Sequence, residues 1–395
     1  MMAAGRAGER GKKVILLEKT NHPGKKLLLC ASGRCNVTNS APLHAFIEAY
    51  GKGGAFLRTA LETFDNERLR AFLLSYGVET VVENKGRVFP RTQKADSVLK
   101  ALEAYMQDNR VIIQTDTRVV RLTIKAGRVH GVETDRGTVS GRNVLIATGG
   151  LSYPSTGSTG DGYSIALSAG HTVAPAYPAI IAFETVETWV KSVQGTPAKN
   201  VNITAHQQGK KIAEQFGEAL FTHYGISGPA ILDMSKRIVE RLPYGPVQIR
   251  IDLKPHHTPE ELDVILVGQI KRHGGKAMKS CLTFFVPEKL APVVLDACSI
   301  EHTKKASQIT LPERKKMLKQ LKCLPLTVIK HRPIEEAIVT AGGIELNETD
   351  AKTMESKIVQ GLYFAGEALD IDGPTGGFNL QAAFSTGYLA GDSVA

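Results

Sequence analysis

The sequence predicts an α/β fold with an inserted β domain, and three patterns carry this prediction. Near the C-terminus, a strand, a glycine-rich loop and a helix follow one another. Near the N-terminus, a helix is followed by a short strand and then by an acidic residue. Between these ends, alternating strands give way to a charged helical stretch and then to glycine-rich strand character again. We therefore expect one α/β domain formed by both ends of the chain and interrupted by insertions.

Composition sets the class of protein. The chain has 395 residues, 42% of them hydrophobic, so it can bury a large core and form two or three domains. It has no apolar run of membrane-spanning length and no signal-peptide core, so we expect a cytoplasmic protein with no membrane partner. Five cysteines are too few for a disulfide framework, and no Cys/His group has zinc spacing, so we expect no metal.

The net charge of +10 is concentrated in part in one segment. Lys304–Lys322 contains seven lysines and arginines and a single glutamate. A solvated helix face is the favoured interpretation, ahead of an anionic substrate or RNA. Nucleic acid is therefore not the partner that we expect.

The C-terminal pattern places a loop rich in backbone donors above a strand. Leu362–Ala365 is a short apolar run, Asp370–Gly377 holds two acids, a proline and three glycines, and Phe378 begins a helix. Such a helix end leaves N–H groups unpaired, which suits an anion or a ring that gains negative charge on reduction. The alternative is a strand–loop–helix that only closes the sheet. The helix also has a small face that can lie against a sheet, formed by Ala382, Ala383, Thr386, Gly387 and Ala390.

The N-terminal pattern resembles the second half of a dinucleotide-binding βαβ unit. Met2–Arg10 is helical, Gly11 ends it, and Val14–Leu17 is an apolar strand followed at once by Glu18. An acid at this strand end can accept hydrogen bonds from ribose hydroxyls; the alternative is an exposed acid. The strand and G-x-G-x-x-G turn that precede such a helix are not in the sequence, which begins inside the helix.

The next stretch, Asn21–Asn39, is expected to be irregular. Its Lys25, Lys26 and Arg34 lie among small residues and could hold a pyrophosphate or a ribityl chain; the alternative is a basic surface loop. Cys30 and Cys35, in the same stretch, have the C-x4-C spacing of flavin disulfide reductases, but free thiols are the favoured interpretation.

Elements of regular structure then follow in order. Residues 41–76 are expected to be helical, Val78–Val82 and Arg87–Phe89 to be strands, and Ala95–Asp108 to be an amphipathic helix. From Val111 to Ile146 the period changes to two, as in a small antiparallel meander carried on a larger sheet.

The last of these strands ends in Ala147-Thr148-Gly149-Gly150. Two glycines at a strand end permit close approach of the backbone to a ligand. Leu151–Gly162 is then expected to be a polar loop, and Tyr163–Ala169 a helix.

The middle of the chain predicts two nested insertions. Alternating segments after residue 184 are interrupted by one helix near Ser227–Glu240, and Thr258–Lys322 is charged and helical. The predicted domains are a first domain at 1–184 and 336–395, a β-barrel-like insert at 185–257 and 324–335, and a helical insert at 258–323.

Five motifs together resemble one family. They are GKKLLLCASGRCNVTN (Gly24–Asn39), ATGGLSYPSTGSTGDGY (Ala147–Tyr163), LFTHYGISGPAIL (Leu220–Leu232), TAGGIEL (Thr340–Leu346) and GLYFAGEALDIDGPTGGFNLQAAFSTG (Gly361–Gly387). The chain is similar, over nearly its whole length, to the HI0933-like or BaiN-like flavoproteins of the aminoacetone-oxidase type. The resemblance implies a Rossmann-like FAD-binding domain of the two-dinucleotide-binding type, a β-barrel-like insert, and a small helical domain inside that insert.

The sequence departs from the family pattern in two places. The strand and glycine fingerprint that open the family's sequences are absent, so we expect FAD binding by this chain to be weakened. Cys30-Ala31-Ser32 also stands where the family usually has Ser-Gly-Gly, which changes the side chains around a backbone-lined pocket.

The resemblance implies a set of cofactor-binding positions. Glu18 would hold the adenosine ribose, the 25–38 stretch the middle of the cofactor, and the helix after Gly377 the pyrimidine edge of the flavin. The full set is Glu18, Lys19, Lys25, Lys26, Gly33, Arg34, Asn36, Thr38, Ala147, Thr148, Gly149, Gly150, Gly366, Glu367, Thr375, Gly376, Gly377, Phe378, Asn379, Leu380 and Gln381.

The function expected from this resemblance is an FAD-dependent oxidoreductase acting on a small organic substrate and linked to NAD(P)H. Acid–base candidates are His223, Tyr153 and Asp370, each with a structural alternative. Three other functions stay open: a disulfide reductase using Cys30 and Cys35, an RNA-associated flavoprotein, and a truncated flavin-free remnant. The sequence leaves the oligomeric state open.

Overall fold

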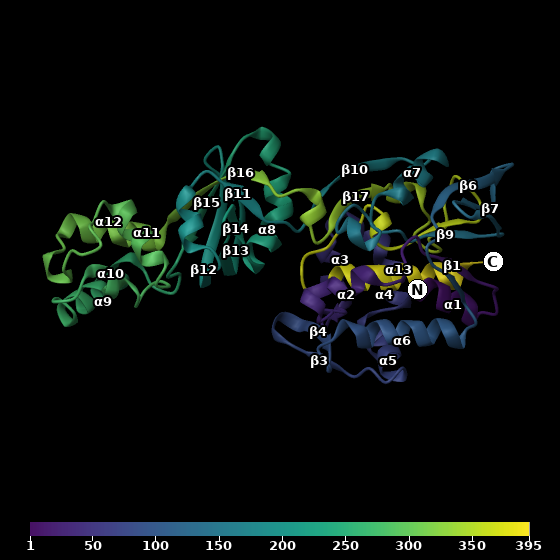
Figure 1. The fold of residues 1–395 in the computed structure, drawn as a ribbon, viewed down its shortest axis with the longest axis horizontal. Helices are drawn as coiled ribbons and strands as arrows, with labels where there is room; N and C mark the ends of the chain where they lie inside the picture. Colours follow the sequence, from purple (N-terminus) through teal and green to yellow (C-terminus); the bar gives the residue numbers. More distant parts are fainter. Residues whose placement is uncertain (395) are drawn as a thin grey trace. The chain divides into compact units, whose positions relative to one another are not determined.

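The computed structural model describes residues 1–394 and divides into two compact units, Met1–Pro178 with Ile334–Ala395 and Ala179–Pro333. The first unit mixes helices with short strands, and the second contains a barrel and a group of helices (Figure 1). The α/β class predicted from the sequence is confirmed.

Parallel strand pairs organise the first unit. β1 (Ile15–Leu17) pairs with β5 (Ile112–Gln114), and β9 (Val144–Ile146) pairs with β18 (Leu362–Phe364), both in parallel. A parallel pair needs a crossover connection, and the segments between these strands supply helices. The helices are α1 (Met2–Glu9), α2 (Lys25–Leu29), α3 (Leu43–Ala49), α4 (Gly54–Thr63), α5 (Asn66–Ser75), α6 (Ala95–Asp108), α7 (Asp161–Ser168) and α13 (Phe378–Ser393).

Antiparallel strands complete this unit. The meander predicted over Val111–Ile146 is confirmed for β6 (Val119–Lys125), β7 (Arg128–Thr134) and β8 (Gly137–Ser140), whereas the first and last strands of that stretch, β5 and β9, pair in parallel with β1 and β18. The other strands are β2 (Thr38–Asn39), β3 (Thr80–Val82), β4 (Arg87–Pro90), β10 (Val173–Pro178) and β17 (Thr340–Ile344). β2, β4 and β3 form one sheet, and β10 pairs with β17.

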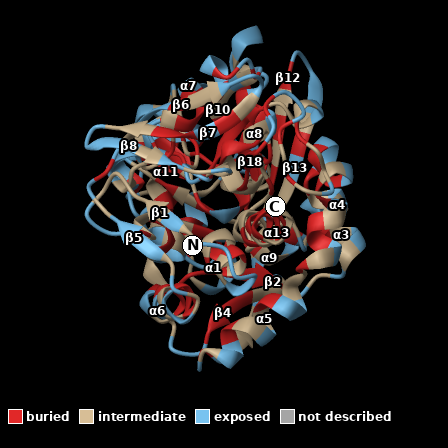
Figure 2. Cartoon of the chain, turned by 90° about the vertical axis from the view of Figure 1, so that its right-hand side faces the viewer, coloured by how far each residue is buried: buried red, intermediate tan, exposed pale blue. Residues whose placement is uncertain are grey.

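Helix α13 is the centre of the first unit. Ala382, Leu389 and Ala390 belong to one hydrophobic cluster, whereas Phe384 belongs to a second cluster that also contains residues of α6. Because both sides of α13 pack against other elements, its buried residues include the polar Gln381, Ser385 and Thr386 as well as apolar ones. Figure 2 shows it largely in the colours of buried and intermediate residues.

Two sequence expectations in this unit need correction. The small face of α13 was expected against a sheet, but Gly387 and Gly391 face α1: a Cβ at Gly391 would lie 2.9 Å from the α-carbon of Ala3. Small residues allow two helices to approach closely as well as a helix and a sheet. In addition, Asn21–Asn39 is not irregular throughout, because it contains the five-residue helix α2. A helix this short shows no periodicity in sequence.

The second unit is built on a closed barrel with strand order β11-β14-β13-β12-β15-β16. Its inward residues alternate along each strand; Val201, Ile203 and Ala205 of β12 are all buried. The strands are β11 (Phe183–Thr185), β12 (Pro197–Gln207), β13 (Lys210–Phe221), β14 (Gly225–Ser227), β15 (Val247–Asp252) and β16 (Leu324–His331).

Helices follow the barrel strands in two places. α8 (Pro229–Val239) lies between β14 and β15 in sequence. Between β15 and β16 come α9 (Pro259–Arg272), α10 (Met278–Leu282), α11 (Leu290–Cys298) and α12 (Leu311–Lys322). Capping boxes begin α9 at Thr258 and α12 at Thr310, which fixes where these charged helices start.

Candidate functional site

The loop that leads into α13 is held in one conformation. Gly377 has a φ of 98°, and a Cβ at this position would lie 2.7 Å from the α-carbon of Thr38, so only glycine fits. The side chain of Asn379 closes the loop: its Oδ1 accepts from Gly373 N at 2.9 Å, and its Nδ2 donates to Gly373 O at 2.8 Å. The first N–H groups of α13 have no intrahelical acceptor, and its first turn holds no acid. This helix end is therefore receptive to negative charge.

The turn after β9 is equally fixed. A Cβ at Gly150 would lie 2.5 Å from Thr340 Oγ1. The same Oγ1 accepts hydrogen bonds from Leu151 N at 2.9 Å and Ser152 N at 3.1 Å, which ties the turn to β17. The carboxyl ends of parallel strands lie at one edge of a sheet, so this turn and the one at Gly366 after β18 adjoin each other.

A polar cluster joins these turns to α2. The Lys26 ammonium group forms an ion pair with Glu367 and donates to Ser152 Oγ at 2.7 Å. Glu367 Oε1 accepts from Thr340 N at 2.7 Å and from Ser152 Oγ at 3.1 Å. Two of the predicted cofactor-binding residues, Lys26 and Glu367, are thus brought together, and each neutralises the charge of the other.

The acid after β1 lies beside the 151–160 loop. Glu18 Oε1 accepts from Thr20 N at 2.8 Å, and a Cβ at Gly157 would lie 3.6 Å from the same oxygen. The neighbouring Lys19 pairs with Asp161 at 3.1 Å. Burial raises the pKa of Asp161, but hydrogen bonds from Arg118 and Lys19 outweigh burial and hold it below its usual value.

In the 34–38 stretch, the side chain of Arg34, a predicted cofactor-binding residue, contacts other residues of the chain. The Arg34 guanidinium lies 4.1 Å from the Phe89 ring centroid, pairs with Glu83 and donates to Gln93 Oε1 at 2.7 Å. Asn36 differs: it is 7% exposed, and within residues 1–394 its buried Oδ1 has no hydrogen-bond partner.

Thr38 and Gln381 share a buried hydrogen bond. Thr38 Oγ1 donates to Gln381 Oε1 at 2.6 Å, and Gln381 Nε2 donates to Phe64 O at 3.0 Å and Ser385 Oγ at 2.9 Å. Because these two side chains are hydrogen-bonded within the core, Thr38 and Gln381 would contact a ligand through their backbone groups.

The remaining predicted positions are placed as follows. Lys25 is partly buried on α2, and Gly33 has a φ of 86°. Ala147, Thr148 and Gly149 follow β9, while Thr375, Gly376, Phe378 and Leu380 lie in the loop and first turn around Gly377. The Phe378 ring packs on Phe46 with centroids 4.9 Å apart.

The acid–base candidates fall in both units. Tyr153 and Asp370 belong to the first unit and His223 to the second. Asp370 Oδ1 accepts from Gly342 N at 3.1 Å, and the His223 ring packs against Tyr224. Burial and the nearby Cys30 raise the pKa of Tyr153. Their catalytic roles stay predictions.

Ser152 and Thr340 were missed from the sequence. Both lie inside motifs that were singled out, LSYP and TAGGIEL, but a hydroxyl that orders a turn has no spacing signature of its own. Among residues 1–394, no group of His, Cys, Asp and Glu could hold a metal ion, and none of the described helices is long and apolar enough to cross a membrane.

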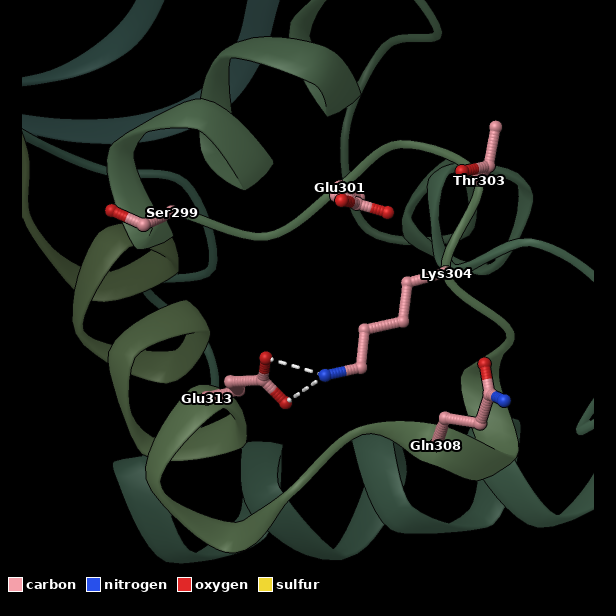
Figure 3. Close-up of a pocket in the computed structure, with 6 residues that line it drawn as sticks. All are labelled: Ser299, Glu301, Thr303, Lys304, Gln308 and Glu313. Atoms are coloured by element: carbon pink, nitrogen blue, oxygen red, sulfur yellow. Dashed lines mark hydrogen bonds and ion pairs between the residues drawn. The ribbon is translucent and has the colours of Figure 1, made fainter.

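A separate polar hollow of about 570 Å³ lies among the helices of the second unit. Lys304 extends across it to Glu313, with Nζ–Oε distances of 2.7 and 2.9 Å (Figure 3). These hydrogen bonds, with those from Thr310, lower the pKa of Glu313 to about 2. Because the folded-state pKa is depressed, the resulting stability is present above pH 4.5 and is lost as pH falls toward 2. The Lys304–Glu313 ion pair thus lines the hollow.

Thr310→Ala should destabilise the second unit by about 1 kcal/mol. The Thr310 side chain accepts from Glu313 N at the start of α12, and this cap would be lost. Urea unfolding measures the change, with Thr303→Ala as the matched control, because Thr303 lines the same hollow and is exposed like Thr310 but is not the N-cap of α12. Equal stability of the two variants would contradict the role of the cap.

Comparison with known proteins gives matches over the whole chain. Residues 1–393 match the family model described as the HI0933-like protein Rossmann domain. A 3-dehydro-bile acid delta(4,6)-reductase from Clostridium scindens is 32% identical over 386 residues, covering 97% of this chain and 93% of that protein. A ribosomal RNA dihydrouridine synthase from Escherichia coli is 28% identical over 399 residues, covering 100% of this chain and 95% of that protein.

Solved structures share the fold. The 3-ketosteroid delta1-dehydrogenase of Sterolibacterium denitrificans has a TM-score of 0.54 and 12% identity, with 99% of this chain and 96% of that chain covered.

Proposed function

The chain belongs to the HI0933-like family of FAD-dependent oxidoreductases, and from this premise we propose that it reduces a carbonyl-conjugated C=C bond in a small organic substrate. FAD would be bound non-covalently by the first unit, and NAD(P)H would be the electron donor. The observation that carries the proposal is the 32% identity with the bile acid reductase over nearly the full length of both chains.

The names of the two relatives describe related chemistry. A 3-dehydro bile acid with delta(4,6) unsaturation and a uridine base each contain a C=C bond conjugated to a carbonyl group. Conjugation makes the far carbon of the bond electron-poor, so that it accepts a hydride, and a proton is then added at the carbon next to the carbonyl. FAD, when bound and reduced by NAD(P)H, would supply the hydride.

The first unit fits FAD on two counts. Asn36 Oδ1 is a buried acceptor that lacks a partner among the described residues, and a cofactor hydroxyl or N–H group would satisfy it. Gly149 and Gly376, both with positive φ, carry no side chain of their own at the ends of two loops. The residues that would hold the cofactor are Glu18, Lys25, Asn36, Gly149, Gly366 and the first turn of α13.

The chain's own groups have separate roles in this proposal. The N–H groups that begin α13 would stabilise negative charge on the reduced ring. The ion pair of Lys26 with Glu367 would keep the two turns and α2 in place. The Tyr153 hydroxyl, whose pKa is raised by burial and by the nearby Cys30, would give its proton to the substrate.

Tyr153→Phe should lower turnover by about 10²- to 10⁴-fold and leave FAD content unchanged, because it removes only the proton donor. Steady-state kinetics and flavin absorbance measure the two quantities. Tyr244→Phe, at an exposed position in the second unit, is the matched control. Unchanged turnover would remove Tyr153 from the mechanism.

The function is tested by product analysis. Protein supplied with FAD and NADH or NADPH is incubated without oxygen with a 3-oxo-4,6-diene bile acid. A product that has gained two hydrogen atoms, formed only when the protein is present, supports the proposal. Absence of reduction with every electron donor, dithionite included, would refute it for this substrate.

A second candidate is reduction of uridine in RNA. It is favoured by the synthase relative and by the basic face of α12, where Lys315, Lys316 and Lys319 are exposed. Under the first candidate, replacing these three lysines with glutamine should change neither FAD content nor small-molecule turnover. Loss of activity on ribosomal RNA in the same variant, with salt-sensitive RNA retention by the wild type, would favour the second candidate. A loss of bound FAD would contradict both.

A further inference from the structure

Two cysteines of the first unit lie in a short closed loop. Cys35 N donates to Cys30 O at 3.0 Å, so their α-carbons are no more than about 7 Å apart, near the span of a disulfide. Ala31 and Ser32, which lie between the two cysteines, have φ values of 49° and 56°, and Cys35 itself has a φ of 61°. Left-handed conformation costs a non-glycine residue about 1 kcal/mol or more, so the loop is a strained segment held by its surroundings.

The two thiols have unequal environments. Both residues are free thiols; Cys30 is partly exposed and Cys35 is fully buried. The nearby Cys35 thiol and Asn36 N–H lower the pKa of Cys30 against the effect of burial, whereas the nearby Cys30 thiol and burial raise the pKa of Cys35 well above its usual value.

The surroundings add no competing charge within the loop. The Arg34 guanidinium forms an ion pair with Glu83 and donates a hydrogen bond to Gln93. From outside the loop, Tyr153 is the titratable group whose pKa responds to Cys30. Cys281 and Cys298 are buried, and burial raises the pKa of both thiols. The 30–35 loop thus places a partly exposed cysteine, whose pKa is lowered, close in the chain to a second, fully buried cysteine.

We propose that Cys30 and Cys35 form a redox-active dithiol that exchanges with low-molecular-weight disulfides such as oxidised glutathione. The Cys30 thiolate attacks one sulfur of the disulfide, forming a mixed disulfide and releasing one thiolate. Cys35 then loses its proton to that thiolate and attacks the Cys30 sulfur, releasing the second thiolate, which takes a proton from water. Two protein thiols are oxidised by two electrons, and one small disulfide is reduced to two thiols. The step requires no FAD, so it stands apart from the proposed reductase function.

Mass analysis of the full chain tests the dithiol. Reduced protein, without added FAD and without oxygen, is treated with oxidised glutathione, and the cysteine peptides are mapped. The wild type should lose two hydrogen atoms, with the new disulfide joining residues 30 and 35. Cys35→Ser should instead keep glutathione on Cys30, and Cys30→Ser should leave Cys35 unmodified. A stable glutathione adduct on Cys30 of the wild type, or no modification of the pair, would overturn the proposal.

The pH dependence of alkylation gives a second readout, and its first comparison uses the wild type alone. In the wild type, Cys30 should react with iodoacetamide at a lower pH than the partly exposed Cys323, which serves as the internal control. In Cys35→Ala, the alkylation curve of Cys30 should move toward that of Cys323, because the thiol that favours the Cys30 thiolate is gone. Coincident curves in the wild type would show that Cys30 lacks the thiolate character on which the exchange depends.

Discussion

Gly377→Ala is expected to abolish FAD binding and to lower the free energy of unfolding by about 3 kcal/mol or more. The φ of 98° is unfavourable for alanine, and the added Cβ would press on the backbone of Thr38, which cannot move away as a side chain could. Relief of this clash requires the start of α13 to shift from β2. The N–H groups that would face the cofactor then lose their position.

The measurements are urea unfolding and a titration with FAD followed by flavin fluorescence. Gly127→Ala is the matched control, because Gly127 has a φ of 73° in the same unit but no atom within 4 Å of an added Cβ. It should cost about 1 kcal/mol and leave FAD binding intact. Wild-type affinity in Gly377→Ala would mean that α13 does not form the cofactor site.

Gln381→Ala is expected to destabilise the first unit by about 3 kcal/mol, because it removes a fully buried side chain together with its hydrogen bonds. The substitution leaves Thr38 Oγ1 with only the long 3.4 Å contact to Asn39 O and leaves Phe64 O without one of its donors, and it opens a cavity at the centre of the unit. Ser385 Oγ still donates to Phe64 O at 2.6 Å, which limits the loss.

Urea unfolding measures this change, and Gln360→Ala, at an exposed position of the same unit, should alter stability by less than about 0.5 kcal/mol. If FAD affinity falls in Gln381→Ala only where the protein has begun to unfold, the side chain is structural. A large loss of affinity at unchanged stability would instead assign it to direct cofactor contact.

Local patterns in the sequence predicted much of the fold. α6 begins and ends where its amphipathic spacing does, at Ala95 and Asp108, since Val98, Leu102 and Tyr105 all face the core. The strand before Gly149-Gly150 and the helix after Gly377 were likewise evident, because apolar runs and glycine clusters are short-range signals.

Partners far apart in the chain could not be predicted in the same way. The contact of Thr38 with Gln381 spans 343 positions, and that of Lys26 with Glu367 spans 341. Arg34 is predicted to face a cofactor, and its side chain also pairs with Glu83 and Gln93, which its own segment of sequence does not reveal. A single sequence reveals which residues are polar but not which of them satisfy one another.

The central claim is that the first unit binds FAD and passes electrons to a carbonyl-conjugated C=C bond. The most direct measurement is anaerobic mixing of the full chain, saturated with FAD and chemically reduced, with a 3-oxo-4,6-diene bile acid. The account predicts that the oxidised-flavin absorbance band returns as the reduced product forms, and that the ring-saturated analogue produces no change. An oxidised band that fails to return with either compound, while excess oxygen still restores it, would contradict the account.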